Sequence, residues 1–251
     1  MLDYSALIPL PDRAEIVVSG KDAEAFLQRL ITNDMAQLAE KPLIYACLLS
    51  PQGKFLFDFL IRKGDAETFF LDCDATRADE LATTLNRYKL RSALTVTHNG
   101  PLAVHADLKG EHGLPDPRHW GLGSRCYGYE GEATGNFSDW DKTRITLTIP
   151  DAVKDVEIGF STLEELNIPN LHGVSYNKGC YVGQELTARM HHRGLGKKHL
   201  RTVRFATTPP EHGTELDNDL GIVKSSIGNM GLVLVKDGQL ENFPPEIGTV
   251  L

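Results

Sequence analysis

Residues 177–185 read Asn-Lys-Gly-Cys-Tyr-Val-Gly-Gln-Glu and bring a thiol, a cation and two glycines together. Good helix formers follow at 184–191, so we expect Cys180 to lie at or just before a helix N-terminus. Unpaired backbone N–H groups there, and the nearby Lys178 ammonium group, would favour the thiolate form. Cys180 is therefore either a reactive or metal-ligating thiol, or a buried cysteine whose glycine neighbours only permit tight packing.

Positive charge is concentrated around the same stretch. The whole chain has a formal net charge of −8, but residues 178–204 carry seven cations against one anion, Glu185. The cations are Lys178, Arg189, Arg193, Lys197, Lys198, Arg201 and Arg204. This segment is either a solvated basic face or a site for an anionic ligand, such as a carboxylate tail or a phosphate backbone.

A single carboxylate, Asp58, stands in an apolar strand pattern. In a strand over 55–62, Asp58 shares one face with Leu56, Leu60 and Arg62, because side chains alternate. A carboxylate in apolar surroundings needs a partner. Either Arg62 pairs with Asp58, or Asp58 faces a ligand cavity and accepts hydrogen bonds from a bound heterocycle.

Alternating strand and helix patterns predict a mixed α+β or α/β core in the first part of the chain. Strands are expected at 15–19, 44–49, 54–63, 68–73, 93–97 and 144–149. The turn residues Ser50-Pro51-Gln52-Gly53 predict a β-hairpin between the second and third of these strands. Helices are expected to follow capping residues at Asp22 and Thr76.

The C-terminal part has a different pattern, because short strand-like segments alternate with glycines after residue 199. Such punctuation is typical of a small β-barrel. We therefore place a boundary at residues 194–196. It separates residues 1–195 from a small β-barrel, 196–251.

Composition points to an ordinary globular protein of 251 residues with 41% hydrophobic residues. Residues 1–20 show no basic segment followed by an apolar one, so no signal peptide is expected, and no apolar run reaches the roughly 18 residues of a membrane helix. The four cysteines, at 47, 73, 126 and 180, lack the spacing of zinc sites or disulfide frameworks. We expect a cytoplasmic location and no metal site, since the adjacent His191 and His192 would point apart on a helix.

Lys178 to Glu185, K-G-C-Y-V-G-Q-E, resembles the signature of the YgfZ family of folate-binding proteins, relatives of the glycine-cleavage T-protein. The resemblance extends over nearly the whole chain. It includes 18–34 (VSGKDAEAFLQRLITND), 48–60 (LLSPQGKFLFDFL), 116–118 (DPR), 171–175 (LHGVS) and 187–194 (TARMHHRG).

The resemblance implies an α+β fold with a three-part, cloverleaf-like arrangement around a central channel that binds tetrahydrofolate. In it, residues 1–195 form a T-protein-like α+β region of two interwoven subdomains. It also implies a role in assembling or maintaining iron-sulfur clusters, especially the [4Fe-4S] type, with an indirect effect on tRNA thio-modification. The family's motif cysteine corresponds to Cys180, the expected reactive thiol, and Asp58 is the other candidate catalytic residue. The expected folate contacts are Asp58, Asn167, Lys178, Tyr181, Gln184, Glu185, Arg189 and Arg193.

Two other functions remain open. The first is a folate-dependent aminomethyltransferase or other one-carbon transferase that uses Asp58 to position or protonate its substrate. The T-protein branch, however, usually has an acidic pair where this chain has Phe57-Asp58, and it lacks the octapeptide. The second is an RNA-binding module, which rests on the basic segment alone and lacks aromatic stacking motifs. The expected partners are folate and iron-sulfur assembly or client proteins, with neither a membrane nor direct nucleic-acid binding.

Overall fold

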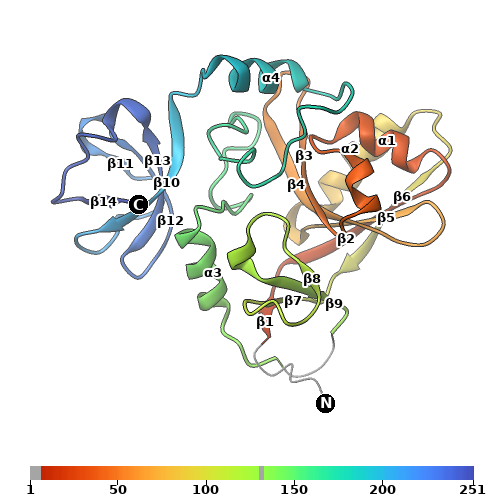
Figure 1. Ribbon diagram of the computed structural model, residues 1–251, viewed down its shortest axis with the longest axis horizontal. Coiled ribbons are helices and arrows are strands. Elements are labelled where there is room, and N and C mark those ends of the chain that lie inside the picture. The colour runs from red at the N-terminus through yellow and green to blue at the C-terminus, as the bar shows by residue number, and fades with distance from the viewer. Residues whose placement is uncertain (1–6, 130–132) are drawn as a thin grey trace.

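Three β-sheets organise the computed structural model, which describes residues 7–129 and 133–251 (Figure 1). The first sheet has the strand order β3-β4-β5-β2-β6. Its strands are β2 (Arg13–Ser19), β3 (Ile44–Leu49), β4 (Phe55–Lys63), β5 (Thr68–Asp74) and β6 (Thr95–Pro101). All pairings in this sheet are antiparallel, and four of the expected strands, at 15–19, 44–49, 54–63 and 68–73, are confirmed within two residues at each end.

Helices α1 (Ala23–Leu30) and α2 (Ala78–Lys89) contribute buried side chains to a core shared with this sheet. Phe26 and Leu27 of α1 and Leu81 and Leu85 of α2 meet alternate residues of the strands. Asp22 occupies the N-cap position of α1, but its carboxylate accepts a hydrogen bond from the backbone N–H of Ala93 instead of capping the helix.

The expected β-hairpin is present between β3 and β4. Its turn closes through Ser50 N–H to the carbonyl oxygen of Lys54 at 2.8 Å, and Gly53 supplies the positive φ of 78°. Every residue of β3 is buried, because a second core on the opposite face packs Tyr45, Cys47 and Leu49 against the segment around Leu163 and Leu171. The sheet is therefore covered on both faces.

The second sheet has the order β1-β7-β9-β8, with β1 (Ile8–Leu10), β7 (Val104–Asp107), β8 (Leu114–Pro115) and β9 (Ser124–Tyr127). Helix α3 (Phe137–Thr146) follows it in the chain. The strand expected at 144–149 is wrong, because this helix, whose first turn is capped by Asn136 accepting from Ser138 N–H, extends to Thr146. Arg144 is buried within the helix rather than at the exposed edge of a strand.

Short 3-10 helices connect several of these elements. They are η1 (Met35–Ala39), η2 (Ala75–Arg77), η3 (Trp120–Leu122), η4 (Asp217–Asp219) and η5 (Asp237–Gln239). The expected cap at Thr76 is wrong, because Arg77 is the N-cap of α2 and makes no side-chain cap, while Asp74 caps the preceding η2 by accepting from Thr76 N–H at 2.8 Å.

The C-terminal part forms the third sheet, which curls into a half-barrel with the order β11-β12-β13-β10-β14 (Figure 1). Its strands are β10 (Lys198–Phe205), β11 (Glu215–Leu216), β12 (Gly221–Ile227), β13 (Met230–Lys236) and β14 (Gly248–Val250). Helix α4 (Gln184–Arg193) runs along the top of the view and leads into this part. The expected α+β class is confirmed, and the boundary at 195–196 stays a prediction.

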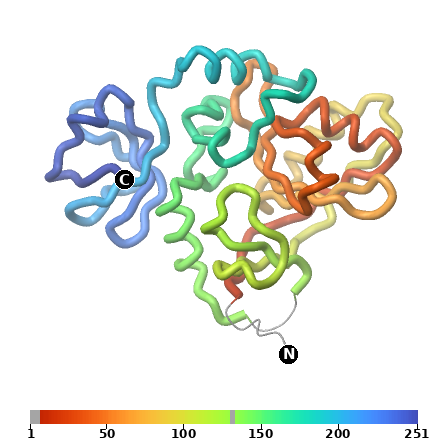
Figure 2. Tube along the Cα trace, in the orientation of Figure 1, coloured from red at the N-terminus to blue at the C-terminus, as the bar shows by residue number. Residues whose placement is uncertain are grey.

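Arg144 joins α3 to the C-terminal sheet. Its guanidinium group donates to Asp155 at 2.8 Å and to the hydroxyl of Ser225 in β12 at 2.9 Å, and Ser225 N–H donates to Asp155 at 2.7 Å. The Asp155 carboxylate thus accepts hydrogen bonds from both α3 and β12. The chain trace in Figure 2 shows the three sheet-bearing parts meeting around the central green segments.

Over the described part of the chain, no helix combines the length and the apolar character that crossing a membrane requires. Residues 1–6, which belong to the segment tested above for a signal peptide, lie outside the described residues.

Candidate functional site

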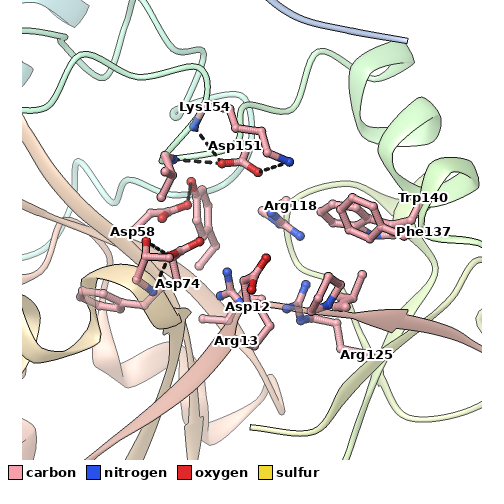
Figure 3. A pocket seen from close by; sticks show the side chains of 17 residues that line it. Asp12, Arg13, Asp58, Asp74, Arg118, Arg125, Phe137, Trp140, Asp151 and Lys154 are labelled. Carbon is pink, nitrogen blue, oxygen red and sulfur yellow. Dashed lines mark hydrogen bonds and ion pairs between the residues drawn. The ribbon is translucent and has the colours of Figure 1, made fainter. Parts of the chain in front are cut away.

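A cavity of about 150 Å³ lies where the first and second sheets meet α3 and the segment that follows it (Figure 3). Tyr45 and Asp58 come from β3 and β4, Arg13 from β2 and Arg125 from β9. The other labelled lining residues are Asp12, Asp74, Arg118, Phe137, Trp140, Asp151 and Lys154. The cavity therefore combines charged groups of both signs with aromatic rings.

The three arginines of the cavity are already paired with carboxylates. Arg13 and Arg125 contact Asp72 at 2.6 and 2.8 Å, while Arg118 contacts Asp116 at 2.7 Å. These cations hold the pKa of Asp72 and Asp116 below their usual values despite burial. Arg125 of β9 ties the second sheet to the first through Asp72 of β5, which Arg13 of β2 also contacts, whereas Arg118 pairs locally with Asp116.

Asp58 differs, because no described cation forms an ion pair with it. It is half-buried, and among the described residues its carboxylate accepts a side-chain hydrogen bond from the Tyr45 hydroxyl at 2.9 Å. Burial raises the pKa of Asp58, although Arg13 and the Tyr45 hydrogen bond oppose the shift. Arg62 pairs with Glu15 instead, so the reading in which Arg62 neutralises Asp58 is wrong, and Asp58 faces the cavity.

Aromatic rings line the side of the cavity opposite Asp58 in Figure 3. Phe137 and Trp140 lie one turn apart on α3 with ring centroids 5.6 Å apart. Asp151 faces the same space but accepts backbone N–H groups from Val153 and Lys154 at 2.9 and 3.0 Å. Asp58, whose carboxylate is held by the Tyr45 hydroxyl, can therefore accept hydrogen bonds from a bound heterocycle.

Cys180 is exposed and does not belong to the lining of this cavity. The other three cysteines, Cys47, Cys73 and Cys126, are buried, and burial raises the pKa of each thiol. The reading of Cys180 as a buried packing cysteine is wrong. Its loop ends at Gly183, the N-cap of α4, so the thiol precedes the helix by four positions.

The loop around Cys180 is held by the residues that flank the thiol. The Lys178 ammonium group donates to the carbonyl oxygens of Gln28, Ile31 and Asn33 at 2.6 to 2.7 Å. The ring of Tyr181 is buried. The Tyr181 backbone N–H donates to Gln184 Oε1 at 3.1 Å.

The remaining predicted folate contacts lie away from the cavity. Asn167 donates to the carbonyl oxygen of Leu200 at 2.7 Å, and Arg189 lies 3.8 Å from Glu185 on the exposed face of α4. Arg193 is exposed in the last turn of that helix. Of the predicted folate contacts, the structure brings only Asp58 to the cavity, and the roles of the others stay predictions.

Acidic residues from distant segments compensate part of the basic segment. Lys198 lies 3.3 Å from Glu165, and Arg201 lies 3.9 Å from Asp237. Part of the positive charge of this segment is therefore neutralised in the folded protein by acidic residues from other segments. Within residues 7–129 and 133–251, no three His, Cys, Asp or Glu side chains are grouped so that they could hold a metal ion.

Sequence reasoning missed most of the cavity wall, including Tyr45, Arg125, Phe137 and Trp140. A signal existed for Arg118, because it belongs to the family-like DPR segment at 116–118. The others come from elements far apart in the chain, and their side chains carry no local pattern that marks a cavity.

Comparison with known proteins gives a family. The model of the GCVT N-terminal domain matches residues 5–103. The human iron-sulfur cluster assembly factor IBA57, a mitochondrial protein, is 30% identical over 92% of this chain and 77% of its own length. Its homologue in Mycosarcoma maydis, also mitochondrial, is 31% identical over 81% of this chain and 59% of its own length.

The fold also matches a solved structure. The glycine cleavage system aminomethyltransferase T from Bartonella henselae superposes with a TM-score of 0.72 over 94% of this chain and 79% of that chain, at 14% identity. The expected cytoplasmic location is contradicted, because the human, mouse and fungal relatives are mitochondrial proteins. This chain belongs to the family of the iron-sulfur cluster assembly factor IBA57.

Proposed function

We propose that this protein supports iron-sulfur cluster assembly or repair, with Cys180 as its working thiol and tetrahydrofolate as the ligand of its central cavity. Two observations support the proposal: the relatives are iron-sulfur cluster assembly factors, and the exposed cysteine lies outside the cavity. The separation between thiol and cavity carries the proposal, because it allows cluster chemistry at the surface while a ligand occupies the interior.

The residues of the cavity fit a reduced folate. A pterin ring is flat and presents N–H donors, which Asp58 can accept because no described cation neutralises it. Phe137 and Trp140 supply aromatic surfaces for such a ring. Burial raises the pKa of Tyr45 well above its usual value, so the phenol stays protonated and keeps Asp58 oriented.

The partners in this function are iron-sulfur assembly or client proteins. An effect on tRNA thio-modification would arise indirectly, through enzymes that carry the clusters. The chain itself contributes the exposed thiol, and the loop geometry keeps that thiol open to a partner protein.

The test is anaerobic calorimetry of tetrahydrofolate binding to the wild type, Asp58→Asn and Cys180→Ala. We expect Cys180→Ala to bind as the wild type does. Asp58→Asn should weaken binding about 10- to 150-fold, the factor for losing hydrogen bonds to a charged acceptor. Absence of binding to the wild type would refute the folate assignment.

A second assay tests the role in cluster assembly. It reconstitutes a [4Fe-4S] client enzyme in the presence of this protein and then measures the activity of that enzyme. Cys180→Ala should abolish the stimulation by this protein. A one-carbon transferase is the competing function, favoured by the half-buried Asp58 carboxylate, whose raised pKa suits a general acid. That function gains if Asp58→Asn stops client reconstitution while Cys180→Ala has no effect.

A further inference from the structure

The C-terminal end of α1 leaves several backbone carbonyl groups without helical partners, as every helix end does. The carbonyl of Leu27 is satisfied by Ile31 N–H at 3.0 Å, within the same segment. Those of Gln28 and Arg29 instead receive hydrogen bonds from the thiol loop, here defined as residues 175–183.

The thiol loop satisfies this helix end on both sides of Cys180. Before the thiol, Ser175 N–H donates to the carbonyl oxygen of Thr32 at 3.0 Å, and Lys178 caps three further carbonyls. After the thiol, Val182 N–H donates to the carbonyl oxygen of Arg29 at 3.2 Å. The loop is thus attached two residues before Cys180 and two residues after it.

Lys178 has no remaining donor for another role. An ammonium group has three N–H donors and no acceptor, and each of the three carbonyl oxygens lies within 2.7 Å of Nζ. The side chain is buried, and the ammonium group lies 5.0 Å from the centroid of the Tyr181 ring. A folate carboxylate or the Cys180 thiolate would have to displace one of these bonds.

The apex between the attachments is open. A Cβ atom placed on Gly179 would meet nothing within 4 Å, and Cys180 is exposed. Gly183 is the opposite, because a Cβ atom there would come within 2.6 Å of the carbonyl oxygen of Ser50. The thiol loop is therefore closely packed at Gly183 and exposed at Cys180.

We propose that Lys178 is a positioning residue, which caps the C-terminal end of α1 and thereby holds the thiol loop so that Cys180 faces a partner protein. The inference rests on the proposed function, in which Cys180 is the working thiol. It assigns the lysine of the motif to the presentation of the cysteine and not to ligand binding or thiol activation.

The test uses a nitroxide label attached to Cys180, which reports loop motion without reference to function. The buried positions of the other three cysteines make the labelling selective. In Lys178→Met, a mobile spectral component should increase about tenfold or more, the factor for losing one hydrogen bond to a charged group. Lys178→Arg, which keeps a cation with several donors, should restore part of the immobile signal.

Lys224→Met is the matched control, because Lys224 is an equally buried lysine in β12 that pairs with Glu157. It should leave the label immobile. The idea is overturned if the label stays immobile in Lys178→Met, or becomes equally mobile in Lys224→Met. If Lys178→Met fails to fold, hydrogen exchange of backbone amides in the wild type tests whether the thiol loop is held. Fast exchange at Ser175 and Val182 would contradict the hydrogen bonds that attach the loop to Thr32 and Arg29.

Client reconstitution provides the functional readout. Lys178→Met should lower it toward the level of Cys180→Ala, while Lys224→Met should not. A mobile loop with full reconstitution would refute the positioning role. Normal reconstitution by Cys180→Ala would instead refute the proposed function, and the label spectra would still decide whether Lys178 holds the loop.

Discussion

Two aspartates of this protein should respond in opposite directions to the same substitution. Asp58→Asn removes a charge that no described cation neutralises, while the Tyr45 hydroxyl can still donate to the amide oxygen. Burial raises the pKa of Asp58, as expected for a carboxylate that is removed from water, although the side-chain hydrogen bond from Tyr45 opposes the shift. We expect Asp58→Asn to stabilise the protein by about 0.5–2 kcal/mol at neutral pH.

Asp155→Asn is the counterpart. Asp155 is fully buried and accepts hydrogen bonds from Arg144 at 2.8 Å, from Ser225 N–H at 2.7 Å and from Asp151 N–H at 2.8 Å. An asparagine has a single acceptor oxygen, so Arg144 or a backbone N–H loses its partner. The expected cost is about 3 kcal/mol, the lower end for breaking a buried pair, because the buried Arg144 then keeps only the partly exposed Asp141 as its ion-pair partner.

Urea unfolding at neutral pH measures both effects as shifts in midpoint at constant slope. In thermal unfolding, each kcal/mol should shift the melting temperature by roughly 2–4 °C for a chain of this size. The gain from Asp58→Asn should disappear in acid. A carboxyl group whose pKa is raised in the folded state stabilises the folded protein while it is protonated, and this stabilisation is lost as pH rises through the raised pKa. A loss of more than about 1 kcal/mol in Asp58→Asn would refute the view of Asp58 as a strained, functional carboxylate.

Four further variants test other parts of the structure. Burial lowers the pKa of Lys178 from 10.5 to about 8. The unfolded chain therefore binds more protons than the folded protein between these pH values, so the stability of the wild type should rise with pH there, by at most about 3 kcal/mol. Urea titrations should show this rise in the wild type but not in Lys178→Met. Gly183→Ala should cost about 1 kcal/mol or more, because φ is 81° and the new Cβ would clash with Ser50, whereas Gly179→Ala should leave the melting temperature unchanged. Arg125→Met should cost about 3–5 kcal/mol by the same assay, since it leaves two buried carboxylates short of a cation, and a cost near zero would contradict the network.

Local patterns were sufficient for much of the fold. The expected strand at 44–49 coincides with β3, and the turn at 50–53 closes the hairpin as its proline and glycine indicate. The amphipathic spacing after Asp22 produced α1. At 144–149 the alternation of apolar residues misled, because the helix that begins after Asn136 continues to Thr146 and buries Arg144 against Asp155. That partner lies outside any local window.

The class of fold, the hairpin that carries Asp58 and the motif that carries Cys180 can be read along the chain, because periodicity, turn chemistry and motif identity are local properties. The partners of these groups come from folding. It paired Arg62 with Glu15, 47 positions away, and so left Asp58 to the cavity. It also brought Lys178 to the carbonyl of Gln28, 150 positions away, and so made it the cap of a helix. Charged side chains take whichever partners folding brings within hydrogen-bond distance, and such contacts between distant segments leave no mark on the local pattern.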